Sequence, residues 1–139
     1  MKPVIIKGGC LADERGILSF NNAFDASAIK RLYTIENISL HLVRGWQGHR
    51  IEQRWFTSIR GGFKIGLVAV DDWDNPAEAS VLSFTLEDVN MDILHVPPGY
   101  VSSIQALSDG AKLLVMADYK LGEVKDEYRF DINFFKNKL

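Results

Sequence analysis

The chain consists largely of short runs of β-branched and aromatic residues separated by glycine, proline and aspartate, and this rhythm limits the folds that it can adopt. Runs that recur about every 8–12 residues with tight turns between them favour an antiparallel sandwich or barrel. No strand–helix–strand rhythm is visible, which argues against a parallel α/β sheet. The predicted strands are Val4–Lys7, Gly16–Phe20, Arg31–Glu36, Leu40–Val43, Arg54–Arg60, Phe63–Val70, Ser80–Leu86, Ile93–Val96 and Leu113–Ala117.

The clearest predicted hairpin surrounds Gly61-Gly62, because glycine reaches positive φ at no steric cost. After this turn Phe63, Ile65 and Leu67 alternate with smaller or polar residues, which is the period of a strand with one buried face. A small antiparallel barrel of such strands can hold one ligand in its mouth, so polar residues on inward faces are the first candidates for function.

Only the C-terminal stretch from Glu123 to Lys138 could hold a helix of any length. Tyr128, Asp131 and Phe135 have the spacing of one helix face, which predicts a terminal helix packed on the barrel. The expected fold class is therefore all-β with a short C-terminal helix.

Composition sets the class of protein. A chain of 139 residues is expected to form one domain, residues 1–139. The net charge of −2 offers no basic field for nucleic acid. Cys10 is the only cysteine, so no internal disulfide forms and a cytoplasmic location is expected. No stretch approaches the ~20 apolar residues that cross a bilayer, and the N-terminal apolar run is too short for a signal peptide.

Gln47 and His49 form the leading candidate for chemistry, in the segment Arg44–Arg50. One residue between them puts both side chains on one face of a strand. Two imidazoles at this spacing would make a metal-ligand pair or a proton relay, but here glutamine occupies one of the two positions. His49 can take and give a proton near neutral pH. The alternative is a strand-end histidine that only hydrogen-bonds.

Tyr33 shares one strand face with Arg31 and Ile35. Inside a barrel this tyrosine could act as a phenolic acid, and the alternative is a core tyrosine with a satisfied hydroxyl. Arginine matches phosphate oxygens with two parallel donors, so several arginines converging on a cavity would suit a diphosphate. The arginines considered for this role are Arg15, Arg31, Arg44 and Arg54.

A metal site has little support in the sequence. His41, His49 and His95 are far apart and form no His-x-His pair, and no carboxylate has an obvious ligand spacing. No glycine-rich phosphate loop and no nucleophile elbow is present. We therefore expect neither a metal nor another cofactor.

The order of the segments resembles the WxcM-like family, the sugar 3,4-ketoisomerases of the RmlC-like cupin superfamily. The resemblance covers nearly the whole chain. Its segments are Asp13–Leu18 (family pattern D-x-R-G-x-L), Lys30–Tyr33 (K-R-x-Y), Arg44–Arg50 (R-G-x-H-A-H-K), the glycines Gly61-Gly62, Leu94–Gly99 (L-Y-I-P-P-G) and the closing strand Leu113–Tyr119.

This resemblance implies a jelly-roll barrel, also called a double-stranded β-helix, in a homodimer that exchanges N-terminal strands. It implies metal-free proton transfer on a dTDP-4-keto-6-deoxyhexose, in which the carbonyl moves from C4 to C3 through an enediol. By position, His49 would be the base and Tyr33 the acid. The substrate-binding residues would be Arg15, Arg31, Arg44, Gln47 and Arg54.

The chain departs from the family pattern at three places. Gln47 replaces the first signature histidine, and Arg54 stands where glutamine is usual. Val101-Ser102 follows the Pro97-Pro98 turn, where the family commonly shows Trp-His. Two further hypotheses therefore stand beside an active isomerase or epimerase: a sugar-nucleotide-binding cupin that has lost the chemistry, and a metal-dependent cupin.

Overall fold

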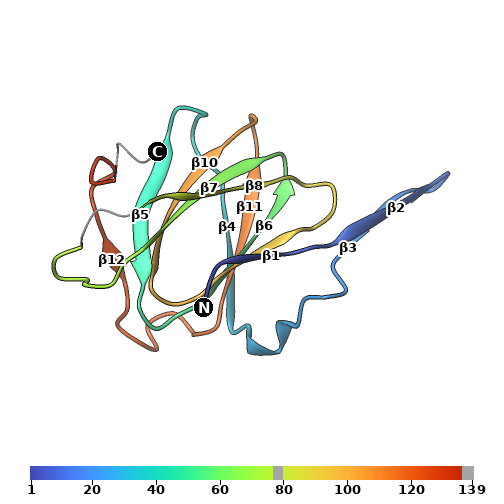
Figure 1. Ribbon diagram of the computed structural model, residues 1–139. Coiled ribbons are helices and arrows are strands. Elements are labelled where there is room, and N and C mark those ends of the chain that lie inside the picture. The colour runs from blue at the N-terminus through green and yellow to red at the C-terminus, as the bar shows by residue number, and fades with distance from the viewer. Residues whose placement is uncertain (77–79, 136–139) are drawn as a thin grey trace.

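Two antiparallel sheets face each other in this protein, seen in a computed structural model that describes residues 1–76 and 80–135 (Figure 1). One sheet has the order β1-β9-β6-β11-β4 and the other β12-β5-β10-β7-β8. A separate hairpin joins β2 and β3. The elements are β1 Val4–Ile6, β2 Gly9–Asp13, β3 Gly16–Phe20, the 3₁₀ turn η1 Ala26–Ala28, β4 Arg31–Ile35, β5 Val43–His49, β6 Arg54–Arg60, β7 Phe63–Ala69, β8 Leu82–Leu86, β9 Ile93–Val96, β10 Tyr100–Ala106, β11 Lys112–Ala117 and β12 Tyr128–Arg129.

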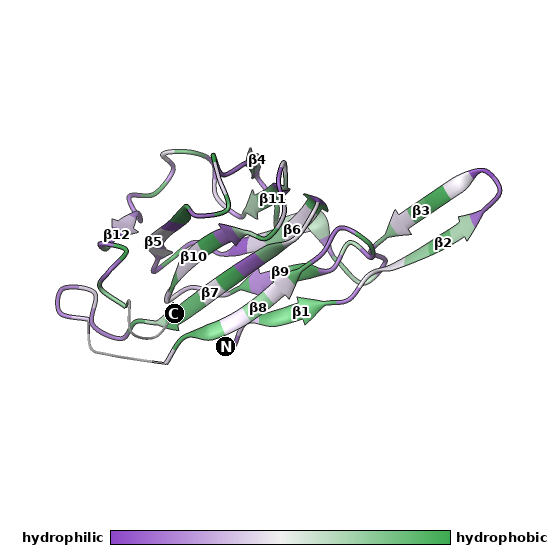
Figure 2. Cartoon of the chain, turned by 90° about the horizontal axis from the view of Figure 1, so that it is seen from above, coloured by the Kyte–Doolittle hydropathy of each residue, from purple (hydrophilic) through white to green (hydrophobic). Residues whose placement is uncertain are grey.

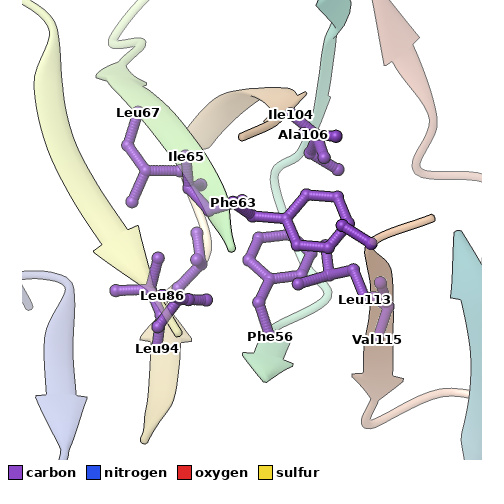
Figure 3. Close-up of a cluster of buried hydrophobic side chains, with 12 residues drawn as sticks. Phe56, Phe63, Ile65, Leu67, Leu86, Leu94, Ile104, Ala106, Leu113 and Val115 are labelled. Carbon is purple, nitrogen blue, oxygen red and sulfur yellow. The ribbon is translucent and has the colours of Figure 1, made fainter. Parts of the chain in front are cut away.

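The inward faces of both sheets build one core. Phe63, Ile65 and Leu67 of β7 are fully buried, as their alternation predicts, and they meet Phe56 and Leu113 from the facing sheet (Figure 3). The all-β jelly roll expected from the sequence is confirmed. No helix in the described part of the chain is long and apolar enough to cross a membrane.

The predicted hairpin at Gly61-Gly62 is wrong in its pairing, although both strands and the turn exist. β6 pairs with β9 and β11, whereas β7 pairs with β8 and β10, so the turn carries the chain from one sheet to the other. Neighbouring loops hold this corner: Gly61 N–H donates to Asp88 at 2.8 Å and Gly62 N–H to the hydroxyl of Ser108 at 3.1 Å. A glycine turn fits a hairpin and a corner equally well, because only the partners of the strands differ.

The strand predicted at Leu40–Val43 is also misplaced, since β5 begins at Val43 and runs to His49. β2, β10 and β12 were not predicted. β10 lies in the middle of its sheet, but its buried Val101 and Ile104 are three residues apart and pack in different clusters, so its sequence shows no apolar alternation. Tertiary pairing on both sides decides such a strand more than its own residues do.

The predicted C-terminal helix is wrong for the residues that the structure describes, 123–135, and residues 136–138 lie outside them. Tyr128 and Arg129 form β12 and pair with Gly48 and Gln47 of β5. Trp46 and Phe130 exchange two main-chain hydrogen bonds, of 3.1 and 2.9 Å. The backbone groups that a helix would use are therefore occupied by the sheet.

The β2–β3 hairpin projects from the barrel as an arm (Figures 1 and 2). It carries apolar side chains that face solvent in the single chain, with Leu11 65%, Ile17 73% and Leu18 63% exposed. Arg15 lies at its tip, 84% exposed, and donates to the Asp13 carboxylate at 2.6 Å.

Candidate functional site

A cavity of about 760 Å³ opens at one end of the barrel. Its residues lie where strands begin or end, and the antiparallel register brings these ends together: Arg54 lies beside Val96 on one neighbouring strand and beside Ala117 on the other. Phe56, Ile35 and Ile104 form the boundary between the cavity and the core, which fills the other end.

The predicted site residues line this cavity, with the exception of Arg15. Arg31 and Tyr33 come from β4, and Arg54 from β6 in the same sheet, while Arg44, Gln47 and His49 come from β5 in the facing sheet. The sequence did not decide whether the four candidate arginines converge on one cavity. In the structure three of them do: Arg31, Arg44 and Arg54. Arg15 lies on the projecting arm and does not reach the cavity of its own chain.

Strand geometry explains how β5 aims three side chains into one space. Gln47 and His49 are two residues apart and share a face. Arg44 has the opposite parity, but β5 has one extra residue between Arg44 and Gln47, where the pairing with β10 shifts register. Such a bulge brings Arg44 to the face of Gln47. On β4 the Arg31 guanidinium lies 4.4 Å from the centre of the Tyr33 ring, a cation–π contact that orders both side chains.

The imidazole of His49 is held by the main chain of a distant segment. Its Nδ1 lies 2.9 Å from the main-chain oxygen of Asp126. A carbonyl oxygen only accepts, so Nδ1 carries the hydrogen and Nε2 of the neutral ring has the free electron pair. Burial is the largest cause that lowers the pKa of His49 below its ordinary value, and the positive charge of Arg54 lowers it further, while Asp126 and Glu52 oppose them. The imidazole of His49 is therefore neutral at physiological pH, with Nε2 free to accept a proton.

Asp126 also ties its segment to the turn that follows His49. The residue as a whole is 2% exposed. Its carboxylate accepts three main-chain hydrogen bonds, from Arg50 at 2.8 Å, Ile51 at 2.9 Å and Glu52 at 2.8 Å. We call this set of contacts the Asp126 clamp. It was not predicted, because Asp126 lies 76 residues from Arg50 and no motif links the two.

Glu52 lies between His49 and Arg54. One carboxylate oxygen accepts from Arg54 Nη1 at 3.1 Å, and the other lies 3.7 Å from His49 Nδ1. Arg54 Nη1 also donates to the main-chain oxygen of Gln53 at 3.1 Å. Glu52 was not singled out from the sequence, although its position three residues after His49 was a usable signal.

The charge around the cavity differs in sign from that of the chain, whose net charge is −2. Of the residues that the structure describes, six with cationic side chains line it: Arg31, Arg44, Arg54, Lys120, Lys125 and Arg129. Three acidic residues line it as well: Glu52, Asp126 and Glu127. Such a concentration of guanidinium and ammonium groups is suited to an anionic ligand.

Gln47 has a partner of its own in Glu127, whose carboxylate accepts from the Gln47 amide. Glu127 also accepts from Arg129 Nη2 at 2.9 Å. The position where a second imidazole would complete a proton relay thus holds an amide fixed by a carboxylate. An amide can orient a hydroxyl group, but it does not transfer protons at neutral pH.

Ligand atoms of His49, Glu52 and Asp126 lie within 4.8 Å of one another, which is close enough to bind a metal ion. Both carboxylate oxygens of Asp126, however, already accept main-chain hydrogen bonds, and His49 Nδ1 donates to the Asp126 carbonyl. A metal here would have to replace the Asp126 clamp, so these residues do not fit a resident metal.

The fold and site define a small jelly-roll protein with a cationic cavity around one buried imidazole. Residues 2–139 match the family described as FdtA: WxcM-like, C-terminal, and the chain belongs to that family. No curated protein matches the sequence.

Solved structures share the fold. The 3,4-ketoisomerase QdtA from Thermoanaerobacterium thermosaccharolyticum, in a mutant form in complex with TDP-4-keto-6-deoxyglucose, is 24% identical with a TM-score of 0.71, over 99% of this chain and 93% of that chain. A 3,4-ketoisomerase from Helicobacter canadensis is 22% identical with a TM-score of 0.72, over 99% and 98%. The rmlC epimerase of Mycobacterium tuberculosis is 15% identical with a TM-score of 0.77, over 99% and 72%.

Proposed function

We propose that this protein is a nucleotide-sugar isomerase that acts on a dTDP-4-keto-6-deoxyhexose by acid–base proton transfer. The observation that carries the proposal is the neutral imidazole of His49, fixed at Nδ1 by the Asp126 carbonyl, in a cavity lined by six cationic side chains. Family membership and the ligand named for QdtA support the same substrate class.

In the proposed reaction His49 Nε2 removes the proton from C3, next to the C4 ketone. The electrons of the C–H bond form a C3–C4 double bond, and the carbonyl electrons move to the C4 oxygen. The move of the carbonyl is complete when C4 takes a proton from His49, the C4 oxygen takes one from Tyr33, and the C3 hydroxyl returns its proton to Tyr33. Tyr33, which lines the cavity from the opposite sheet, is the proposed acid. Nothing is oxidised or reduced overall, so no external electron acceptor is needed.

Binding of the diphosphate is assigned to cations at the cavity mouth. Arg44 and Arg129 are exposed there and present forked donors that match phosphate oxygens. Arg31, stacked on Tyr33, lies further in. Gln47, held by Glu127, is proposed to orient a sugar hydroxyl.

The exposed arm supports a homodimer. An isolated two-stranded hairpin is marginally stable in water, and Leu11, Ile17 and Leu18 gain from burial on a partner. We propose that the arm packs on a second copy and brings Arg15 to the partner's cavity, which would explain why this predicted site residue is remote from its own.

The test is incubation with dTDP-4-keto-6-deoxyglucose in deuterated solvent, followed by NMR at the sugar carbons. We expect deuterium at C4 of the product, and its loss in His49→Asn. The second candidate is a sugar-nucleotide-binding cupin without turnover, which the engaged amide at Gln47 favours. Thermal stabilisation by the ligand with no deuterium incorporation would select that candidate instead.

A further inference from the structure

Arg54 is the most deeply buried of the cavity's cations in the described part of the chain, 7% exposed, and among the described residues only its Nη1 has hydrogen-bond partners. Nη1 makes its two hydrogen bonds to Glu52 and Gln53. Nε is buried without a partner. The hydrogen bonds that Arg54 makes to described residues both come from Nη1, so Nη2 donates to none of these residues. Leaving a donor of a buried charged group unpaired costs free energy, and a ligand atom in the cavity that accepts from Nη2 would recover part of this cost.

Arg54 is also the cation next to the base. Glu52 contacts Arg54 with one oxygen and approaches His49 with the other, so the imidazole and the guanidinium flank the same carboxylate. The charge of Arg54 is felt at His49, where it lowers the pKa. His49 and Arg54 line the same cavity, so a sugar ring bound against the imidazole would lie close to Arg54, whereas a diphosphate would lie nearer the exposed cations at the mouth.

Proton abstraction beside a ketone creates negative charge on the carbonyl oxygen. A preorganised donor at that oxygen, in a site shielded from water, stabilises the transition state more than the ground state. Arg54 meets both conditions, since it is buried and since Glu52 and the Gln53 carbonyl fix its guanidinium before a ligand enters. Glutamine, which the family pattern usually has at this position, would offer a neutral donor.

Resting on the proposed function, we propose that Arg54 is a catalytic residue whose free donors stabilise the enediolate oxygen formed when His49 removes the proton from the neighbouring carbon. The C–H electron pair becomes the C–C double bond, the carbonyl π electrons become the oxyanion, and the proton resides on His49. His49 then gives its proton to the second carbon, and the hydroxyl proton of the first carbon passes to the oxyanion, so that a ketone and a hydroxyl group are present again and the base is neutral.

The experiment measures kcat and KM across pH for Arg54→Gln, Arg54→Lys and Glu52→Gln, with dTDP-4-keto-6-deoxyglucose as substrate. Full pH profiles are needed because removing the Arg54 charge also raises the pKa of His49, so values are compared on the plateau above neutrality. Loss of one oxyanion donor costs on the order of 10²–10³-fold in kcat. We expect a loss of about 10²-fold in kcat for Arg54→Gln with KM within a few-fold, and a smaller loss for Arg54→Lys; Glu52→Gln is measured as the reference for the double variant described below. Arg60→Gln, an exposed position on the same strand and outside the cavity, is the matched control.

A raised KM with unchanged kcat in Arg54→Gln overturns the inference, because Arg54 would then bind a ground-state group. If that variant does not fold, the double variant Glu52→Gln/Arg54→Gln leaves no uncompensated buried charge, and its comparison with Glu52→Gln isolates Arg54. Equal kcat in that pair also overturns the inference. Absence of turnover in the parent protein contradicts the proposed function instead, which separates the two failures.

Discussion

The Nδ1 atom of His49 lies 2.9 Å from the main-chain oxygen of Asp126, a residue 77 positions further along the chain. The carboxylate of the same Asp126 holds the turn that leaves His49, through three main-chain donors. One residue therefore fixes both the tautomer of the imidazole and the backbone that carries it.

The Asp126 clamp predicts a stability cost for Asp126→Asn. An amide has one acceptor oxygen and turns its NH2 toward at least one main-chain N–H, leaving a buried donor unpaired. Hydrogen bonds to charged groups contribute about 1.5–3 kcal/mol each, so we expect a loss of about 2–4 kcal/mol in the free energy of unfolding, measured by urea denaturation. The control is Asp131→Asn, an exposed position in the same segment whose carboxylate bonds only locally to Asn133. Equal stability of the two variants would show that the clamp contributes little.

The lowered pKa of His49 predicts the pH dependence of turnover. The base must be unprotonated, so kcat/KM should rise with pH through an apparent pKa below 6.5, the ordinary value, and stay level through neutral pH. Arg54→Gln should move this limb upward, because the positive charge that lowers the pKa is removed. An acid limb above pH 7 in the parent protein would contradict the neutral-base assignment.

Stability should fall on acidification for a related reason. Burial lowers the pKa of His95, which stacks on Trp55 and hydrogen-bonds with Gln53 at 2.6 Å, while the charge of Asp118 opposes this effect. The unfolded chain then binds more protons than the folded one, so this contribution is complete above pH 6.5 and is lost as the pH falls toward the folded value. The free energy of unfolding, measured with urea between pH 7.5 and 5.5, should fall less for His95→Gln than for the parent protein.

Charge at the cavity mouth predicts a salt-dependent KM. Arg44 and Arg129 are exposed, and exposed charges are screened over about 8 Å at physiological ionic strength. Arg44→Gln and Arg129→Gln should raise KM, leave kcat near the parent value and flatten the rise of KM with added salt. A fall in kcat at constant KM would instead assign these side chains to the chemical step.

The proposed arm exchange predicts complementation between two inactive proteins. Arg15→Gln and His49→Asn remove residues that would meet in one cavity only if they come from different copies. Equal mixing by co-refolding gives heterodimers in half of the dimers, each with one intact cavity, so about a quarter of the parent activity should return. If sedimentation shows that the mixture is dimeric and no activity returns, the proposed exchange is wrong. Arg15 would then act within its own chain or have no role in the site.

The spacing of apolar and polar residues along the chain predicted which strand faces are buried. The alternation of Phe63, Ile65 and Leu67 identified a buried strand face, and the spacing of Arg31 and Tyr33 identified a shared one. The pairing partner of each strand could not be predicted from the sequence, because the Gly61-Gly62 turn fits a hairpin and a corner between sheets equally well. The C-terminal aromatics at helical spacing instead pack around Trp46, since β5 offers their backbone a sheet edge.

In the candidate site, too, some residues could be predicted from the sequence and others could not. His49, Tyr33 and the arginines were predicted from residue type and strand parity, and the resemblance assigned them roles. Asp126 and Glu127 were missed because their contacts depend on how the chain returns to β5 after β11. Glu52 was missed because a single acid near a histidine is ordinary in a sequence; its significance comes from Arg54 on its other side.

The stretch from Lys120 to Glu127 supplies one wall of the cavity and also contains the anchor of the imidazole. Substitutions at Lys120 and Lys125, which line the cavity, should therefore change which ligand fits without moving the imidazole of His49, the proposed base. An insertion or deletion next to Asp126 would be tolerated less well, because it would change both the access of a ligand to the cavity and the basicity of the His49 imidazole.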